Sequence, residues 1–505
     1  MKSEFSIYPG YENELYEEGL WYEQSERTSD IQLPPAMNIL LLTVWAVISL
    51  IGIAVIFLGK NTAAGIVIIA IPTFVGMIMK PTFALCIMML ALPTGAGVGA
   101  GQDFSLDRGV GIAVALSFVL NLLITRPRLH IGNKALWVVV LYTLWVLLVS
   151  LAAPYFGLEL RRAFTQVQLL VLIFIVYWIL QTNGPKTFHW ALRAYLIGTL
   201  GTIVLALITG AAIRSVEQTS EARYSATLGQ AIDANMLASL ISLAFLSAIY
   251  LFARDKKILW RIMYFVALLV LPIMLLKIGS RGALMALAFT MLSPLLFIRQ
   301  VARKPGLAAL VLVAILFACV SAGLVVKTRG LENGVAEGLT DIHRARDAVG
   351  YRMMPIKQAV RCVVRKPAGT SYFGWFENSG LRILPHNDFF LALGLYGIPA
   401  AGLFTLFIIM LMWTVKRTPL GLEKIYARAI LTFLLVMGLN VGQLYQKHFW
   451  VFLVFVITCE RIAALFTPPA QNEYEENGLL MMDEGPETPD EDFADAYSDG
   501  DRFSG

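Results

Sequence analysis

The chain has 505 residues, of which 57% are hydrophobic and 15% charged, and its mean hydropathy is +0.68. Soluble domains carry about 25% charged residues, so this composition excludes an ordinary soluble protein and predicts an integral membrane protein. The formal net charge of +5 is unevenly distributed: residues 1–36 hold 2 basic against 8 acidic residues, residues 467–505 hold 1 against 12, and the remainder is near +22. This cationic body would suit an anionic ligand or phospholipid head groups.

Apolar runs long enough to cross a membrane, or nearly so, recur along the chain. The first begins near residue 37 behind an acidic leader, which is not the basic start of a cleavable signal peptide. The runs predict an all-α polytopic protein with about 12–14 transmembrane helices, at 37–58, 62–79, 82–98, 109–124, 135–153, 163–181, 191–212, 232–253, 259–277, 282–298, 305–326, 387–413, 425–443 and 449–466.

Basic loops give the orientation. The segments TRPRLHIGNK, ARDKK, RQVARK and VKRTPLGLEK follow the fourth, eighth, tenth and twelfth runs. Even numbers of runs separate them, so they share one face, and the positive-inside rule makes that face cytoplasmic. Both tails then lie in the cytoplasm, and their low apolar content and like charges predict disorder. The opposite, extracytoplasmic face would carry Arg161, Arg223, Arg281, Lys447 and the long polar loop.

The chain therefore divides into five predicted segments. These are an acidic tail (1–36), a transmembrane bundle (37–326), a large periplasmic loop (327–386), C-terminal transmembrane helices (387–466) and a second acidic tail (467–505). No internal repeat of the kind that builds many transporters is evident.

No metal site or cofactor is predicted. The four cysteines show no CxxC spacing and no plausible pairing, since Cys86, Cys319 and Cys459 lie in apolar runs and Cys362 is alone in a polar loop. No HExxH motif occurs in the sequence.

Two arginines on the outer face mark a candidate anion site. Arg223 precedes a span in EARYSATLGQAIDANMLASL, and Arg281 lies in KIGSRGALMAL, where almost no loop separates two apolar runs. Backbone N–H groups and a guanidinium at such a helix start suit a phosphate. Equally, Arg281 could contact lipid phosphates at the membrane interface.

The long loop contains two notable stretches. In DAVGYRMMPIKQAVRCVVRKP the apolar residues follow helical spacing, which predicts an amphipathic helix lying on the membrane or capping a cavity. The following AGTSYFGWFENSGLRILPHN is rich in glycine and aromatic residues. Its aromatic rings could form a platform for a sugar, although Trp375 could equally belong to an interfacial aromatic belt.

The segment PHNDFF places a titratable group at the start of the next span. His386 can accept a proton as a general base, although a lone interfacial histidine is more often structural, and Asn387 or Asp388 is suited to cap the helix. Arg161 and Arg162 in GLELRRAF could steer a diphosphate or bind lipid head groups. Lys447 and His448 in LYQKHFW are expected to be interfacial.

Together these patterns resemble the O-antigen ligase and polysaccharide polymerase superfamily. The resemblance rests on Arg223, on GSRGA, on GYRMMPIKQAVRCVVRKPAGTSYFGWF and on PHNDFFLALGLYGIPAAG, and it covers about residues 37–466. The segment AGTSYFGWF departs from the GxGxGxF pattern of the family. Members are metal-independent, GT-C-like glycosyltransferases that take a glycan from undecaprenyl diphosphate on the outer face of the bacterial inner membrane.

The resemblance implies roles for particular residues. Arg223 and Arg281 would hold the diphosphate and His386 would activate the acceptor hydroxyl as the catalytic set, in an inverting transfer. Substrate contacts are expected from Arg161, Arg162, Arg352 and Asn387. The expected partners are a lipid-linked glycan donor, a lipid or polysaccharide acceptor and membrane lipids, with no nucleic acid, and the protein would be a monomer or small oligomer.

The acceptor stays open. A ligase would use lipid A core and a polymerase a second lipid-linked glycan, while a related activity uses protein; the single long loop favours the ligase. The alternative from another class is a transporter or flippase of lipid-linked sugars, which would place charges near the midplane of the spans. Nearly every span interior lacks charged residues, with Asp233 the nearest exception.

Overall fold

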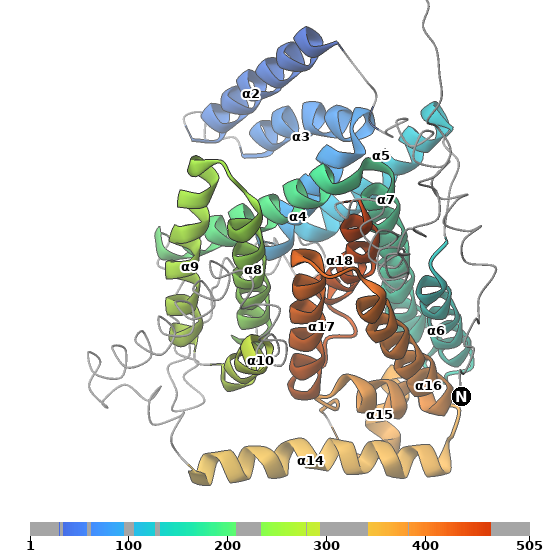
Figure 1. Ribbon diagram of the computed structural model, residues 1–505. Helices are drawn as coiled ribbons and strands as arrows, with labels where there is room; N and C mark the ends of the chain where they lie inside the picture. The colour runs from blue at the N-terminus through green and yellow to red at the C-terminus, as the bar shows by residue number, and fades with distance from the viewer. Residues whose placement is uncertain are drawn as a thin grey trace, which may run out of the picture. The chain divides into compact units, whose positions relative to one another are not determined.

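The computed structural model describes residues 30, 34–57, 62–94, 106–126, 132–208, 234–278, 280–292, 342–381 and 383–465. The regular secondary structure of these residues is entirely helical (Figure 1), which confirms the predicted all-α class. The helices are α2 (Pro35–Phe57), α3 (Thr62–Met79), α4 (Pro81–Thr94), α5 (Leu106–Thr125), α6 (Lys134–Leu151), α7 (Phe156–Ile208), α8 (Ala234–Arg254), α9 (Ile258–Ile278), α10 (Arg281–Leu292), α14 (Ile342–Arg365), α15 (Tyr372–Ser379), α16 (Asp388–Arg417), α17 (Leu422–Asn440) and α18 (Lys447–Ala464).

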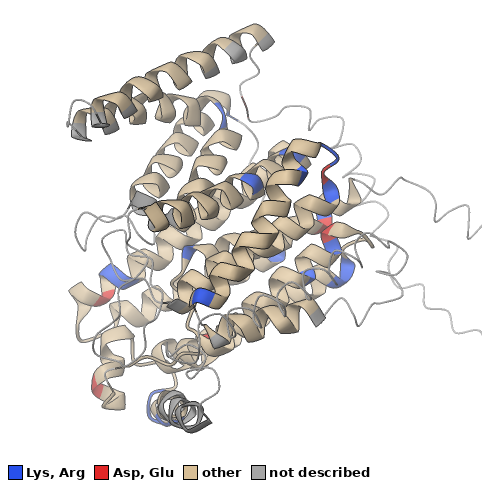
Figure 2. Ribbon diagram, turned by 90° about the vertical axis from the view of Figure 1, so that its left-hand side faces the viewer, with Lys and Arg blue, Asp and Glu red and all other residues tan. Residues whose placement is uncertain are grey.

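The helices have the apolar character of a membrane protein. Five described segments are long and apolar enough to cross a bilayer, at Lys134–Leu151, Phe156–Leu205, Asn235–Arg254, Ile258–Ile278 and Asp388–Arg417. In Figure 2 charged residues occupy only a few positions of the ribbon. The larger predicted number of spans and the GT-C-like relationship stay predictions, and the run at 305–326 lies outside the described residues, as do the two acidic tails almost entirely.

Two predicted spans, 163–181 and 191–212, turn out to belong to one long helix, α7. The helix is interrupted at Gly184, where φ is 69° and ψ is −163°, and Pro185 follows. That backbone conformation is open almost only to glycine, and proline cannot donate to the preceding turn. The connection between the two predicted spans is therefore a single break between two helical halves.

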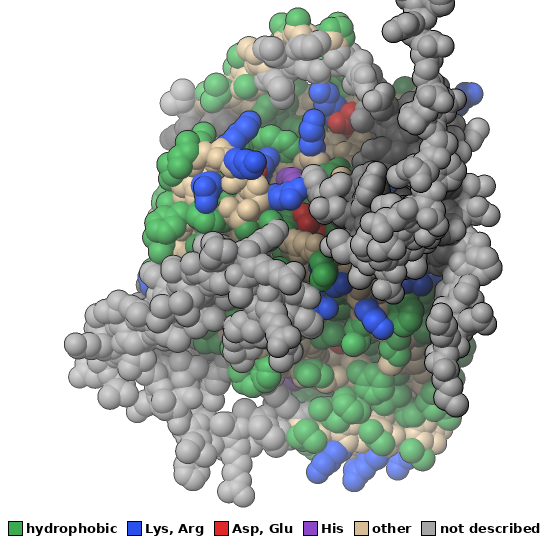
Figure 3. Space-filling view, viewed as in Figure 1, with side chains coloured by type: hydrophobic (Ala, Val, Ile, Leu, Met, Phe, Trp, Pro, Cys, Tyr) green, Lys and Arg blue, Asp and Glu red, His purple; other side chains and the backbone are tan. Residues whose placement is uncertain are grey.

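The predicted amphipathic helix of the polar loop is α14. Ala359 and Cys362 are buried on the side that packs against α15 and α16. Val360 and Val364 are exposed beside the exposed Lys357, Arg361 and Arg365. In Figure 3 basic side chains lie along the lower edge, where Figure 1 draws α14. This pairing of apolar and basic residues on one exposed side suits a helix at a membrane surface.

Helix α16 is interrupted at Gly397, and other segments of the chain supply the hydrogen bonds that the interruption leaves unmade. Gly397 has φ 77° and ψ −170°, which leaves preceding carbonyl groups without helical partners. The Leu395 carbonyl accepts from Thr370 N at 2.9 Å and from Ser371 N at 2.7 Å, and the Tyr396 carbonyl accepts from Trp145 Nε1 at 2.7 Å. Backbone that interrupts a membrane helix needs such partners, because hydrocarbon offers none.

Gly397 and Gly369 are required because the interrupted part of α16 and the segment before α15 approach each other closely through their backbones. A Cβ at Gly397 would lie 2.2 Å from the Pro367 carbonyl oxygen, and one at Gly369 would lie 2.6 Å from the Tyr396 carbonyl carbon. Gly369 also has φ +109°. The AGTS segment, which departs from the family pattern, therefore serves here as the partner of the α16 break.

Replacement of Gly397 by alanine should destabilise the protein by about 2 kcal/mol or more, because alanine cannot adopt this backbone region without strain and its Cβ would displace the Pro367 carbonyl. The measurement is the thermal unfolding midpoint of purified protein in detergent. Gly402→Ala is the matched control, since it lies on the same helix with nothing within 4 Å of the new Cβ. Equal midpoints for the two variants would contradict this account.

A cluster of charged and aromatic side chains lies at the C-terminal end of α8. The Arg193 guanidinium donates to both carboxylate oxygens of Asp255 at 2.7 Å and lies 4.8 Å from the Trp190 ring centre and 4.9 Å from that of Trp260. Burial raises the pKa of Asp255, but hydrogen bonds from Tyr264 and Arg193 outweigh it and leave the pKa below its ordinary value. The ion pair joins the second half of α7 to the α8–α9 connection.

The stabilisation from Asp255 should depend on pH. Its pKa is lower in the folded protein than in the unfolded chain, so the stabilisation is fully present above the unfolded value of about 3.9 and is lost as pH falls through the folded value. Wild type should therefore melt above Asp255→Asn at neutral pH, and the gap should shrink below about pH 4. A gap that stays constant down to about pH 3 would contradict this assignment.

Candidate functional site

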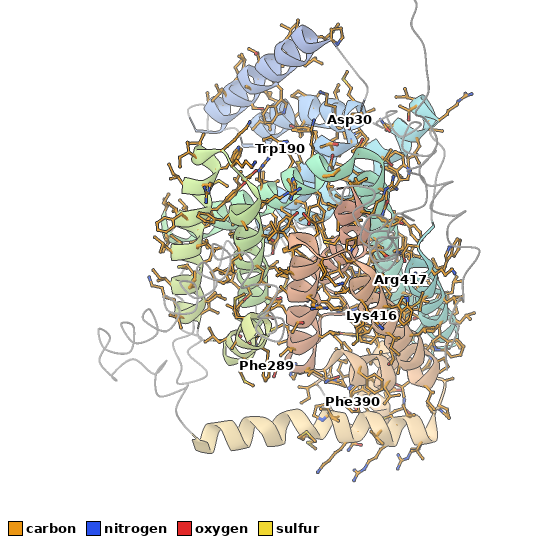
Figure 4. All side chains as sticks on the ribbon, in the orientation of Figure 1. Asp30, Trp190, Phe289, Phe390, Lys416 and Arg417 are labelled. Carbon is orange, nitrogen blue, oxygen red and sulfur yellow. The ribbon has the colours of Figure 1, made fainter. Side chains whose placement is uncertain are left out.

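A cavity of about 290 Å³ lies where several helices begin. The ends of α8, α15, α16 and α18 contribute to its wall, together with the first turns of α7 and the α17–α18 turn. Its lining residues are Arg162, Asn235, Met236, Ser239, Tyr372, Leu384, Pro385, His386, Leu391, Val441, Gly442, Gln443, Tyr445, Gln446 and His448. In Figure 4 Phe390, which lies at the start of α16 next to the lining residue Leu391, is labelled in the lower part of the view. Trp190, which belongs to the charged cluster, is labelled in the upper part.

Two of the residues singled out in the sequence meet in this cavity. His386 is exposed at the start of α16, and Arg162 comes from the beginning of α7. The guanidinium carbon of Arg162 lies 4.4 Å from the centre of the Tyr372 ring, a cation–π contact. An imidazole and a guanidinium more than 200 residues apart in sequence are thereby brought to one cavity.

Tyr372 is positioned by a buried carboxylate that the sequence analysis did not identify. The Glu159 side chain is 0% exposed and accepts hydrogen bonds from Tyr372 N at 3.1 Å and Phe373 N at 2.5 Å. These amides begin α15, so the carboxylate satisfies N–H groups that the helix itself cannot and complements its dipole. The acidic residue in the arginine-rich segment GLELRRAF was the available signal.

The two candidate caps of α16 have separate functions. Asn387 is the cap: its side-chain oxygen accepts from Phe390 N at 3.2 Å. Asp388 instead accepts from Gln443 N at 2.5 Å and Leu444 N at 3.0 Å, in the α17–α18 turn. Asn387 is buried in this role and is not among the lining residues, so its predicted substrate contact stays a prediction.

The GSRG turn reaches the cavity through a neighbouring side chain. The Ser280 hydroxyl donates to Asn235 Oδ1 at 2.7 Å and accepts from Ala283 N at 3.3 Å, so it caps α10 and contacts a lining residue. Arg281 is the first residue of α10; its side chain lies outside the described part of the chain. Ser280, the residue before Arg281, thus contacts a residue of the cavity wall.

The remaining predicted residues are distributed as follows. Arg161 is exposed on α7 but is not a lining residue. Arg352 belongs to α14, although its side chain is not described, and Arg223 lies outside the described residues altogether. Their proposed substrate contacts therefore stay predictions.

His448 differs from the expectation of an interfacial side chain. It is 2% exposed and lines the cavity together with Gln443, which is 1% exposed. Sequence alone could not reveal this, because both follow from the course of the α17–α18 turn rather than from a motif. Tyr445 also enters the lining, and its hydroxyl is 2.6 Å from that of Tyr396 on α16.

The electrostatic character of the cavity is cationic to neutral. None of its lining residues carries a carboxylate, and Arg162 contributes a positive charge. The starts of α8 and α18 lie at the cavity and add partial positive charge there, whereas the first amides of α15 already donate to Glu159. An anionic group with attached hydroxyl groups is the chemistry that such a lining accommodates.

Within the described residues, no group of three His, Cys, Asp or Glu side chains is placed to hold a metal ion. No family model matches the chain, and no curated protein matches it. The resemblance to the ligase and polymerase superfamily therefore rests on the sequence motifs quoted above.

Removal of the Asp388 carboxylate should destabilise the protein and disturb the cavity. Asp388→Ala leaves Gln443 N and Leu444 N without their acceptor, at a cost of about 1–3 kcal/mol for each buried donor. Asp388→Asn retains an acceptor oxygen and should lose less. Thermal unfolding midpoints of the three proteins test this order, and an alanine variant as stable as wild type would contradict the assigned role.

Proposed function

We propose that this protein is an O-antigen ligase-like glycosyltransferase. It transfers a glycan from undecaprenyl diphosphate to an acceptor hydroxyl on the extracytoplasmic face of the membrane, without a metal ion. The observation that carries the proposal is the meeting of His386 and Arg162 in one cavity whose described lining residues include no carboxylate. The sequence resemblance supplies the substrate class, and the geometry is compatible with it.

The reaction needs two kinds of group. The acceptor oxygen attacks the anomeric carbon, the bond from that carbon to the diphosphate oxygen breaks, and the bonding electrons leave on the diphosphate. Arginine side chains stabilise the negative charge that develops on the diphosphate. This stabilisation lowers the barrier because the charge is greater in the transition state than in the bound substrate. His386 takes the proton of the acceptor hydroxyl.

Under this proposal, the two roles belong to residues from different helices of the cavity wall. Arg162 lies on the α7 side, against Tyr372, and His386 lies at the start of α16. Arg281, which begins α10, and Arg223 are assigned to the diphosphate by the resemblance. Displacement in one step would invert the anomeric configuration.

Substitution of His386 or Arg281 should abolish transfer. The assay uses purified protein in detergent with EDTA, an undecaprenyl diphosphate-linked glycan as donor, and lipid A core or a second lipid-linked glycan as acceptor. His386→Ala and Arg281→Ala should each lower turnover by about 100-fold or more. His386→Gln separates the roles, because an amide can position a hydroxyl by hydrogen bonding but cannot take its proton.

Arg261→Ala is the control, since Arg261 is exposed on α9 and contacts the ring of Phe252. It should keep the wild-type rate. Wild-type turnover by either the His386→Ala or the Arg281→Ala protein would contradict the mechanism. The acceptor consumed distinguishes ligase from polymerase, and donor binding without transfer to either acceptor would favour a protein acceptor or transport.

A further inference from the structure

Polar atoms of three side chains in the cavity wall have no hydrogen-bond partner in the described part of the chain. The Ser239 hydroxyl, both polar atoms of the Gln443 amide and Nε2 of His448 lack one among the described residues. Each of these residues is at most 2% exposed, and all three line the cavity. Buried polar groups are nearly always paired in folded proteins, so three unpaired ones on one cavity point to a missing ligand.

We propose that Ser239, Gln443 and His448 form a binding site for the hydroxyl groups of a sugar ring and select the glycan that enters the cavity. This inference rests on the proposed function and deepens it, since it assigns to the same cavity a site for a neutral, hydroxyl-rich group beside the anion-binding arginines. The proposed function itself gives none of these three residues a role.

The chemistry of the three groups favours a sugar over a charged ligand. An amide offers a donor and an acceptor, a hydroxyl offers both at one atom, and an imidazole nitrogen offers either. Sugar hydroxyl groups also donate and accept, so they can satisfy all of these atoms. A diphosphate only accepts, and a lipid tail does neither.

The aromatic residues beside these groups support the same reading. The rings of Tyr372 and Tyr445 are 6.0 Å apart and edge to face, and both line the cavity. Tyr372 is fixed by Glu159 through its backbone amide, and Tyr445 by the hydroxyl of Tyr396. Apolar ring surface next to hydrogen-bonding groups matches a sugar, whose C–H groups and hydroxyl groups occupy different sides.

The first test needs no ligand and compares two serines on α8. Ser239 is unpaired, whereas the Ser247 hydroxyl donates to the Leu243 carbonyl at 2.8 Å and lies 3.0 Å from the Tyr426 hydroxyl. Removing an unpaired group held for a ligand costs no internal hydrogen bond. Ser239→Ala and Gln443→Leu should therefore keep or raise the unfolding midpoint of the free protein, while Ser247→Ala lowers it by a few degrees. A lower midpoint for Ser239→Ala and Gln443→Leu would assign them a structural role and overturn the proposal.

The second test measures binding to the full-length protein in detergent. The probes are sugar-free undecaprenyl diphosphate and a panel of undecaprenyl diphosphate-linked monosaccharides that carry glucose, galactose or their N-acetylamino forms. Wild type should bind at least one sugar-bearing probe about tenfold more tightly than the sugar-free lipid, a difference of about 1.4 kcal/mol. Gln443→Leu should erase this difference and leave the Kd of the sugar-free lipid unchanged.

The outcomes separate this proposal from the proposed function. If wild type binds the sugar-free lipid tightly and no sugar improves binding, or if Gln443→Leu keeps the preference, the sugar site is refuted while the diphosphate site stands. If wild type binds no lipid probe, the proposed function fails. Methyl glycosides of the same sugars then decide: a rise in the unfolding midpoint of wild type that Gln443→Leu lacks supports the sugar site, and no rise refutes it.

Discussion

The hydrogen bonds from the α17–α18 turn to Asp388 are the constraint on which the candidate site depends. A buried carboxylate requires donors, and Asp388 obtains two from consecutive backbone amides, of Gln443 and Leu444. The start of α16, which carries His386, is thereby fixed against the segment that carries Gln443 and leads to His448. Gly438 makes the approach possible, since a Cβ there would lie 2.5 Å from Asp388 Oδ2.

Two further contacts near the cavity also join distant segments through hydrogen bonds to backbone groups. Glu159 receives the first amides of α15, and the carbonyls released by the Gly397 break in α16 receive the amides of Thr370 and Ser371. Each contact connects segments far apart in sequence. A lipid environment supplies no hydrogen bonds, so separation of these segments would leave the polar groups unpaired. That cost holds the segments of the cavity wall in place.

The sequence predicted the helical class, the apolar runs and the amphipathic helix α14, because each of these depends on composition or periodicity. It singled out His386 and Arg162 and placed them on one face, but their meeting in one cavity is a tertiary property that only the structure gives. It did not predict the functions of Glu159 and Asp388, since a carboxylate that binds backbone amides has no signature beyond its own side chain. It also misjudged His448 as interfacial. The burial of that residue depends on how the α17–α18 turn folds back to Asp388, which is a tertiary property.

The use of carboxylates at this end also explains the charge of the cavity. Glu159 and Asp388 are both buried, and both accept from backbone amides instead of lining the cavity. Both carboxyl groups thus accept from local N–H groups, while Arg162 and the starts of α8 and α18 face the space where a ligand would lie. An anionic ligand would meet attraction from these groups without a facing carboxylate. Among the described residues, polar atoms of Ser239, Gln443 and His448 have no partner beside it, and such local departures from a fully satisfied interior are expected at functional sites.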